Sequence, residues 1–136
     1  MKTVSILLVE DDDIDAMGVE RAFKKARIAN PIVRAHDGVE ALEALRNQRM
    51  SSPYLILLDL NMPRMNGLEF LAEVRADPSL HKALIFVLTT SSSDEDIARA
   101  YQQHIAGYVV KSSLDQDFTQ LLGLLDYYWR MIEFPD

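Results

Sequence analysis

Apolar residues are concentrated in five short runs, each about the length of a β-strand. The runs cover residues 4–9, 32–35, 54–58, 84–88 and 107–111. Apolar residues are unbroken over 55–58 and 84–88, which is typical of strands that helices cover on both faces of a parallel sheet. The pattern therefore predicts five strands, of which at least these two are buried on both sides.

Between and after these runs, apolar residues recur at helical spacing and predict five helices. The first begins at the acids after residue 9 and continues to about residue 28, and the second begins at Asp37-Gly38. The third begins after residue 67 and stops before Asp77-Pro78. Ser93, followed by three acids, predicts the N-cap of a fourth helix that extends through Tyr101. The last helix should include Leu114 near its start and Ile132 near its end.

Alternating strands and helices predict an α/β fold with helices on both faces of a parallel sheet. Right-handed crossovers favour an open, doubly wound sheet, and the common flavodoxin-like order of five strands is 2-1-3-4-5. In such a sheet, ligands bind outside the carboxyl ends of the strands, beside the switch between the first and third. Glu10 and Asp11 follow the first strand, and Asp59 follows the third. We therefore expect these three carboxylates to share one site.

A cluster of three carboxylates predicts a bound cation. At a separation of roughly 4 Å and an effective dielectric of 20, each like-charge pair costs about 4 kcal/mol. Such a cluster needs a cation or a raised pKa. Oxygen ligands and room for a phosphoryl group favour Mg²⁺, whereas zinc is disfavoured because no Cys is present and no His lies near these positions. Thr89 and Lys111 end the fourth and fifth strands, and they would complete the parts that phosphoryl transfer needs.

Composition narrows the class of protein. At 136 residues, the chain predicts one domain over 1–136. The apolar runs are too short to cross a membrane, and no signal peptide is evident. The absence of Cys fits the cytoplasm. The net charge of -7 argues against nucleic-acid binding, which needs a basic surface.

Four motifs at the predicted strand ends resemble the response-regulator receiver domain of two-component signalling. They are VEDD at 9–12, Asp59 with MPRMNG at 62–67, Thr89, and YVVK at 108–111. The resemblance implies that a phosphohistidine of a sensor histidine kinase phosphorylates Asp59, and that Lys111 and Thr89 contact the phosphoryl group. It also implies that Asp11, Asp59 and the backbone carbonyl of Asn61 bind Mg²⁺, with Glu10 assisting through water. Thr89 and Tyr108 match the pair that switches position on phosphorylation.

The same resemblance implies a protein that assists phosphorylation and hydrolysis of its own aspartate and is not an enzyme. Its message would pass to a downstream protein or phosphotransfer partner. Ser112 stands where receivers usually have proline in a cis bond. Because a cis bond without proline costs about 3–4 kcal/mol, we expect a trans Lys111–Ser112 bond and a shifted loop. This Lys-Ser variant resembles the small stand-alone receivers that partner phytochrome-type sensor kinases. His104 occupies a position where the family commonly has Gly.

The C-terminal segment contains more aromatic residues than one sheet-covering face of a helix needs. Aromatic residues, Met and Arg are enriched at protein interfaces. We therefore hypothesise a homodimer or a kinase contact in this segment. The aromatic candidates are Tyr127, Tyr128, Trp129 and Phe134.

Other interpretations remain open. Asp12, Asp13 and Asp15 are expected to be helix-start acids rather than ligands, and Tyr108 could be only a packed aromatic. The chain could be a receiver that docks without being phosphorylated. An aspartyl-nucleophile phosphatase is disfavoured because Asn61 stands where such enzymes place a second Asp. A flavin or nucleotide module is disfavoured because no Gly-rich phosphate loop follows a strand.

Overall fold

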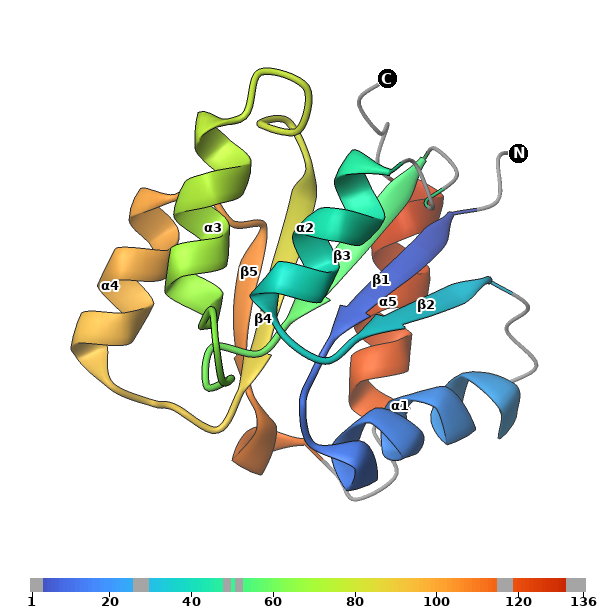
Figure 1. Ribbon diagram of the computed structural model, residues 1–136. Helices are drawn as coiled ribbons and strands as arrows, with labels where there is room; N and C mark the ends of the chain where they lie inside the picture. Colours follow the sequence, from blue (N-terminus) through green and yellow to red (C-terminus); the bar gives the residue numbers. More distant parts are fainter. Residues whose placement is uncertain (1–3, 26–29, 48–49, 51–52, 115–118, 132–136) are drawn as a thin grey trace.

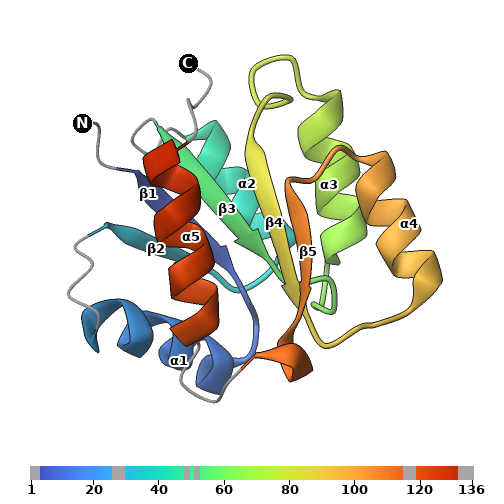
Figure 2. The same cartoon turned by 180° about the vertical axis from the view of Figure 1, so that it is seen from behind.

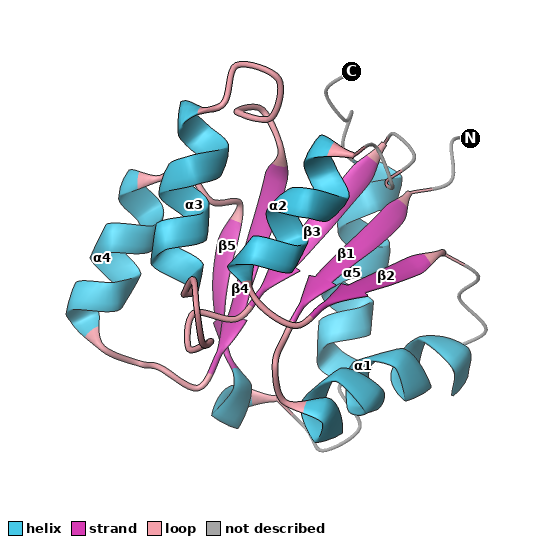
Figure 3. Ribbon diagram, in the orientation of Figure 1, coloured by secondary structure: helices cyan, strands magenta, loops and turns pink. Residues whose placement is uncertain are grey.

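Five parallel strands form one sheet in the order β2-β1-β3-β4-β5 (Figure 1). The computed structural model describes residues 4–25, 30–47, 50, 53–114 and 119–131. The arrowheads of all five strands point toward the same edge of the sheet (Figure 3). This arrangement confirms the predicted doubly wound α/β fold and its strand order. The strands are β1 (Ser5–Val9), β2 (Ile32–Ala35), β3 (Tyr54–Leu58), β4 (Leu84–Thr89) and β5 (Gly107–Val110).

Helices cover both faces of the sheet. In Figure 1, α2, α3 and α4 lie in front of it, and Figure 2 shows α5 on the opposite face, close to α1. A short 3₁₀ turn, η1, joins β5 to the segment before α5. The elements are α1 (Asp13–Lys25), α2 (Gly38–Arg46), α3 (Gly67–Ala76), α4 (Asp94–Gln102), η1 (Lys111–Ser113) and α5 (Thr119–Met131).

Alternating side chains of each strand fill two separate cores. On β1, Leu7 and Val9 pack with the apolar faces of α2 and α3, whereas Ile6 and Leu8 pack with α1 and α5. Because successive side chains of a strand point to opposite faces, an unbroken apolar run supplies both cores at once. Phe70 is among the largest fully buried residues of the first core, and Phe23 is among the largest of the second.

Side chains cap the N-termini of α2, α3 and α4. Ser93 caps α4, which confirms the predicted cap, and Asp37 caps α2 at the predicted start of that helix. Asn66 and Glu69 form a reciprocal capping box at the start of α3. At the end of α4, His104 adopts φ 58°, the left-handed conformation in which Gly is usually favoured. Among the described residues, no helix combines the length and apolar character needed to cross a bilayer.

The main differences from prediction lie at the ends of elements. In the described residues α1 ends at Lys25, and the predicted end near residue 28 falls outside them. The last helix was predicted to include Leu114, which is wrong. The N–H of Leu114 donates to the Lys111 carbonyl and closes η1, and the backbone of Leu114 is extended. The configuration of the Lys111–Ser112 bond stays a prediction, and Ile132 lies outside the described residues.

Candidate functional site

Three carboxylates meet beyond the carboxyl ends of β1 and β3. One oxygen from each of Glu10, Asp11 and Asp59 lies within 4.8 Å of the others. The strands bring them together because Val9 pairs with Leu58, and the Asp59 N–H donates to the Val9 carbonyl at 3.0 Å. Glu10 and Asp59 are only 3% and 6% exposed, whereas Asp11 is exposed to solvent. An all-oxygen set of this kind, open on one side, fits a hard divalent cation such as Mg²⁺.

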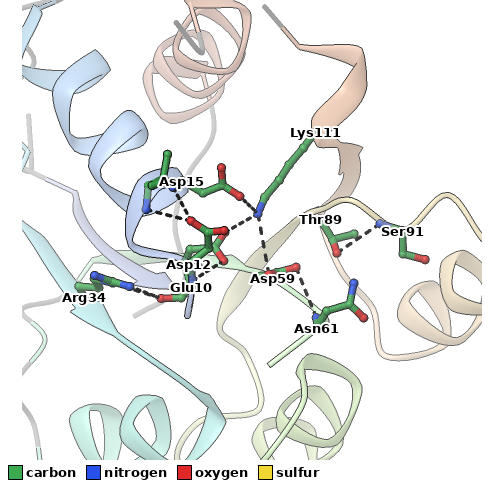
Figure 4. Close-up of polar contacts among 10 residues, drawn as sticks. Glu10, Asp12, Asp15, Arg34, Asp59, Asn61, Thr89, Ser91 and Lys111 are labelled. Atoms are coloured by element: carbon green, nitrogen blue, oxygen red, sulfur yellow. Dashed lines mark hydrogen bonds and ion pairs between the residues drawn. The ribbon is translucent and has the colours of Figure 1, made fainter. Parts of the chain in front are cut away.

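Lys111 reaches into this cluster from the end of β5 (Figure 4). Its Nζ donates to Glu10 Oε1 at 2.6 Å and to Asp15 Oδ2 at 2.7 Å, and it lies 3.8 Å from Asp59 Oδ2. Burial alone would lower the pKa of Lys111, but the bonds to Asp15 and Glu10 and the charge of Asp59 raise it above its ordinary value. The ammonium is therefore a fixed positive charge beside Asp59.

Glu10 has the most perturbed carboxylate of the site. Burial raises the pKa of Glu10 to about 7, and the nearby charge of Asp59 adds to this rise, while Lys111 opposes it. Its second carboxylate oxygen accepts the Asp12 N–H at 3.3 Å. The cluster is thus short of positive charge even with Lys111 in place, as expected of a site that binds a cation.

The acids after Glu10 have separate structural roles. Asp12 caps α1, since its Oδ1 accepts the N–H groups of Ile14 and Asp15 at 2.9 and 3.1 Å, which confirms it as a helix-start acid. Asp13 pairs with Arg34 at 2.8 Å. The expectation for Asp15 was incomplete, because this side chain points back to Lys111 (Figure 4). The sequence signal for Asp15 was its spacing: it lies three residues after the capping Asp12, and this places it in the first turn of α1.

Sequence reasoning also missed Arg34 on β2. Its Nε and Nη2 donate to the backbone carbonyl of Glu10 at 3.1 and 2.9 Å (Figure 4). Because it also pairs with Asp13, the guanidinium joins the end of β1 to the first turn of α1. An arginine in an otherwise apolar short strand was the available signal.

Thr89 lies on the side of Asp59 away from Glu10, and Tyr108 is joined to the loop that follows Thr89 (Figure 4). Thr89 ends β4 and is fully buried, and its hydroxyl accepts the N–H of Ser91 at 3.5 Å. The Tyr108 hydroxyl donates to the Ser91 carbonyl at 2.9 Å, and the Ser91 hydroxyl donates to Asp96 at 2.6 Å. Burial raises the pKa of Tyr108. The Ser91 loop is therefore held by both β5 and α4.

The loop after Asp59 forms one wall of an open hollow. The N–H of Asn61 donates to Asp59 Oδ1 at 3.4 Å, and the N–H of Gly67 donates to the Leu60 carbonyl at 2.9 Å. A Cβ at Gly67 would lie 2.5 Å from the Asp59 carbonyl oxygen, so only Gly allows this approach. The hollow measures about 520 Å³ and its lining includes Asp11, Asn61, Met62, Pro63, Asp96 and Arg99.

The aromatic residues of the C-terminal segment do not act alike. Tyr127 is 68% exposed, whereas the ring of Tyr128 meets Phe86 edge-on with centroids 4.9 Å apart. Tyr128 therefore packs partly against the core, and the place of Tyr127 and Tyr128 in an interface stays a prediction. The side chain of Trp129, and the whole of Phe134, lie outside the described part of the structure.

Known proteins resemble this chain over almost its entire length. The family described as the response regulator receiver domain matches residues 6–123. The response regulator Rcp1 of Synechocystis sp. is 34% identical over 128 residues, covering 91% of this chain and 87% of Rcp1. The Mn²⁺-bound crystal structure of Rcp1 has a TM-score of 0.85 at 32% identity and covers 98% of this chain and 99% of that one. The crystal structure of the phosphorylated cyanobacterial phytochrome response regulator RcpA has a TM-score of 0.88 at 33% identity. It covers 99% of this chain and 100% of that one.

Sequence, fold and acidic cluster lead to the same assignment. The family match covers far more than half of the chain, and Rcp1 and RcpA each match more than nine-tenths of it. The expected resemblance to phytochrome-type response regulators is confirmed by the Rcp1 and RcpA structures. This chain belongs to the response regulator receiver domain family of two-component signalling.

Proposed function

We propose that Asp59 accepts a phosphoryl group from the phosphohistidine of a sensor histidine kinase in the cytoplasm. The observation that carries this proposal is the position of Asp59, which lies in one cluster with Glu10 and Asp11 and 3.8 Å from the ammonium of Lys111. A phosphoryl group is known on the relative RcpA, and RcpA and Rcp1 are response regulators, RcpA of a phytochrome. A phytochrome-type kinase is therefore the proposed donor.

The transfer requires a bound divalent cation, which Glu10, Asp11, Asp59 and the backbone carbonyl of Asn61 would hold. When bound, Mg²⁺ supplies positive charge to the oxygens of the phosphoryl group. A carboxylate oxygen of Asp59 attacks phosphorus, and the P–N bond to the imidazole breaks, with its electron pair returning to nitrogen. Hydrolysis reverses the modification: water attacks phosphorus and the Asp59 oxygen leaves, which gives inorganic phosphate and a free carboxylate.

Thr89 and Lys111 are the proposed contacts of the transferred group. Lys111 offsets negative charge on the phosphoryl oxygens, and the Thr89 hydroxyl donates a hydrogen bond to one of them. Thr89 would then move toward Asp59 and release the Ser91 N–H. The Tyr108 hydroxyl is hydrogen-bonded to the Ser91 carbonyl. A shift of the loop that contains Ser91 would therefore change the position of the Tyr108 side chain and the shape of the surface near α4.

A downstream protein or a phosphotransfer partner would bind the altered surface. The protein is proposed to assist its own phosphorylation and dephosphorylation without acting on other substrates. An aspartyl-nucleophile phosphatase fits less well because residue 61 is Asn rather than a second acid. A receiver that only docks also fits less well, since Glu10, Asp11, Asp59 and Lys111 are brought together.

The test is the intact mass of the protein after exposure to acetyl phosphate with Mg²⁺. We expect an added phosphate on the wild type that is labile to acid and base, and none on Asp59→Asn. The same experiment in excess chelator should give no adduct. An equal adduct on Asp59→Asn, or none on the wild type, would falsify the proposed function.

A further inference from the structure

We propose that Asp15 is a positioning residue that holds Lys111 back from Asp59 and thereby limits how tightly Lys111 binds the phosphoryl group. This inference rests on the proposed phosphorylation of Asp59. It gives a role to a carboxylate outside the three-acid cluster. The structural observation behind it is that the Lys111 ammonium hydrogen-bonds Glu10 and Asp15, whereas its ion pair with Asp59 is longer, at 3.8 Å.

The distances show where the ammonium is held. Lys111 Nζ lies 2.6 Å from Glu10 Oε1 and 2.7 Å from Asp15 Oδ2, both short charge-assisted hydrogen bonds. The distance of 3.8 Å to Asp59 Oδ2 is beyond hydrogen-bonding range. Glu10 and Asp15 approach from the end of β1 and from the first turn of α1, on the side of Lys111 away from Thr89 (Figure 4). Together they draw the ammonium toward α1.

A phosphoryl group on Asp59 must compete for this ammonium. To reach it, Lys111 has to weaken one of its two existing bonds. The Asp15 side chain is 33% exposed and that of Glu10 only 4%, so water can replace the lysine at Asp15 far more readily. The bond to Asp15 is therefore the one that yields. A stronger bond between Lys111 and Asp15 costs more free energy to break, and this cost reduces the net free energy with which Lys111 binds the phosphoryl group.

The rest of the site explains why Asp15 is free to take this part. Asp12 already caps α1, so the Asp15 carboxylate is not needed to cap that helix. Asp13 forms an ion pair with Arg34. The first turn of α1 thus contains two acids with different partners, Asp13 and Asp15. Asp13→Asn and Asp15→Asn form a matched pair of variants: each removes one negative charge, but only Asp15→Asn removes a partner of Lys111.

The test uses fluoroberyllate with Mg²⁺ as the phosphoryl analogue on the full chain. We expect Asp15→Asn to bind it about fivefold more tightly than the wild type, the upper end for a partly exposed ion pair. Asp13→Asn should stay within about twofold, since it leaves the bonds of Lys111 intact. Asp15→Glu, which keeps the carboxylate, should bind nearly as the wild type does. The increase should also disappear when Asp15→Asn is combined with Lys111→Met, as expected if Asp15 acts through Lys111.

A second readout needs neither metal nor analogue. In ¹⁵N-lysine-labelled, chelator-treated protein, the Lys111 ammonium should give a protected signal that shifts in Asp15→Asn and not in Asp13→Asn. An unchanged signal, equal affinities of Asp15→Asn and the wild type, or equal gains in Asp15→Asn and Asp13→Asn would each overturn the inference. A wild type that binds no fluoroberyllate would overturn the proposed function as well, so the two failures can be told apart.

Discussion

Glu10 is buried beside a second carboxylate, and this has a consequence for stability. In the metal-free protein its pKa is about 7, against an ordinary value of 4.5 that also applies to the unfolded chain. Between these values the folded state keeps a proton that the unfolded state has lost. The free energy of unfolding therefore falls as pH rises from about 4.5 to about 7, by about 3 kcal/mol for this residue at most.

We predict that Glu10→Gln removes this pH-dependent loss. Relative to the wild type, the variant should gain about 3 kcal/mol in free energy of unfolding between pH 4 and pH 8, because Gln has no proton to release. Urea unfolding in the presence of a chelator, followed by circular dichroism at several pH values, measures the difference. A difference that stays constant over this range would show that the Glu10 carboxylate ionises in the fold as easily as in solution.

At the residue scale, the sequence identified the acids of the site but not the contacts of its lysine. Glu10, Asp11 and Asp59 could be placed because strand ends in a parallel sheet share one edge. Asp15 could not, because its bond to Lys111 depends on the direction of a side chain in the first turn of α1, 96 residues away in sequence. Arg34 was missed because no periodicity shows which backbone carbonyl an arginine will reach.

The connection between β3 and α3 depends on the absence of a side chain at Gly67. A Cβ there would lie 2.5 Å from the Asp59 carbonyl oxygen and 2.6 Å from the Leu60 Cα, both backbone atoms. Neither can move without shifting the strand end that supports Asp59. The start of α3 is thus fixed against the site by backbone contact.

We predict that Gly67→Ala lowers the free energy of unfolding by about 1–3 kcal/mol, as overpacking does. Gly123→Ala in α5 is the control: apart from adjacent residues and the backbone of its own helix, no described atom lies within 4 Å of the added Cβ, so the variant should gain about 0.5–1 kcal/mol from helix propensity. Urea unfolding of both variants decides the matter. If Gly67→Ala were as stable as Gly123→Ala, the close approach at Gly67 would not constrain the fold.

At the element scale, apolar patterning predicted the strands better than the last helix. An unbroken apolar run predicts a buried strand without any need to know which side chains point to which face of the sheet. For this reason β3 begins and ends as predicted. Leu114 matched the periodicity of the last helix because its side chain does pack against the α1 and α5 core. Its backbone is extended because η1 first redirects the chain. The pattern thus predicted burial correctly and the local conformation wrongly.

At the scale of the whole molecule, exposed apolar side chains follow the described part of α5 in a stripe. Leu124, Tyr127 and Met131 are all exposed and recur at helical spacing, with Tyr127 at 68%. The homodimer stays a prediction, and these three exposed side chains are candidates for its contact. Deleting the segment from Tyr127 onward would also remove the Tyr128 packing against Phe86, so a point variant is the better test.

We predict that the wild type sediments as a dimer and that Tyr127→Lys sediments as a monomer, because a charge in the apolar stripe must be desolvated on association. Tyr101→Lys on α4, where the tyrosine is 49% exposed, is the matched control and should remain dimeric. Sedimentation velocity at several concentrations distinguishes these outcomes. A monomeric wild type, or a dimer that survives Tyr127→Lys, would reject the α5 stripe as the interface.

The hydrogen bond between Lys111 and Glu10 joins residues that are 101 positions apart in the chain. During synthesis the ribosome releases the amino end first. Glu10, Asp11 and Asp59 therefore emerge, and can begin to gather, well before their cationic partner does. Until then their mutual repulsion opposes pairing of β1 with β3. A divalent ion in the cell can screen that repulsion, so the ion proposed for signalling would also assist assembly of the nascent chain.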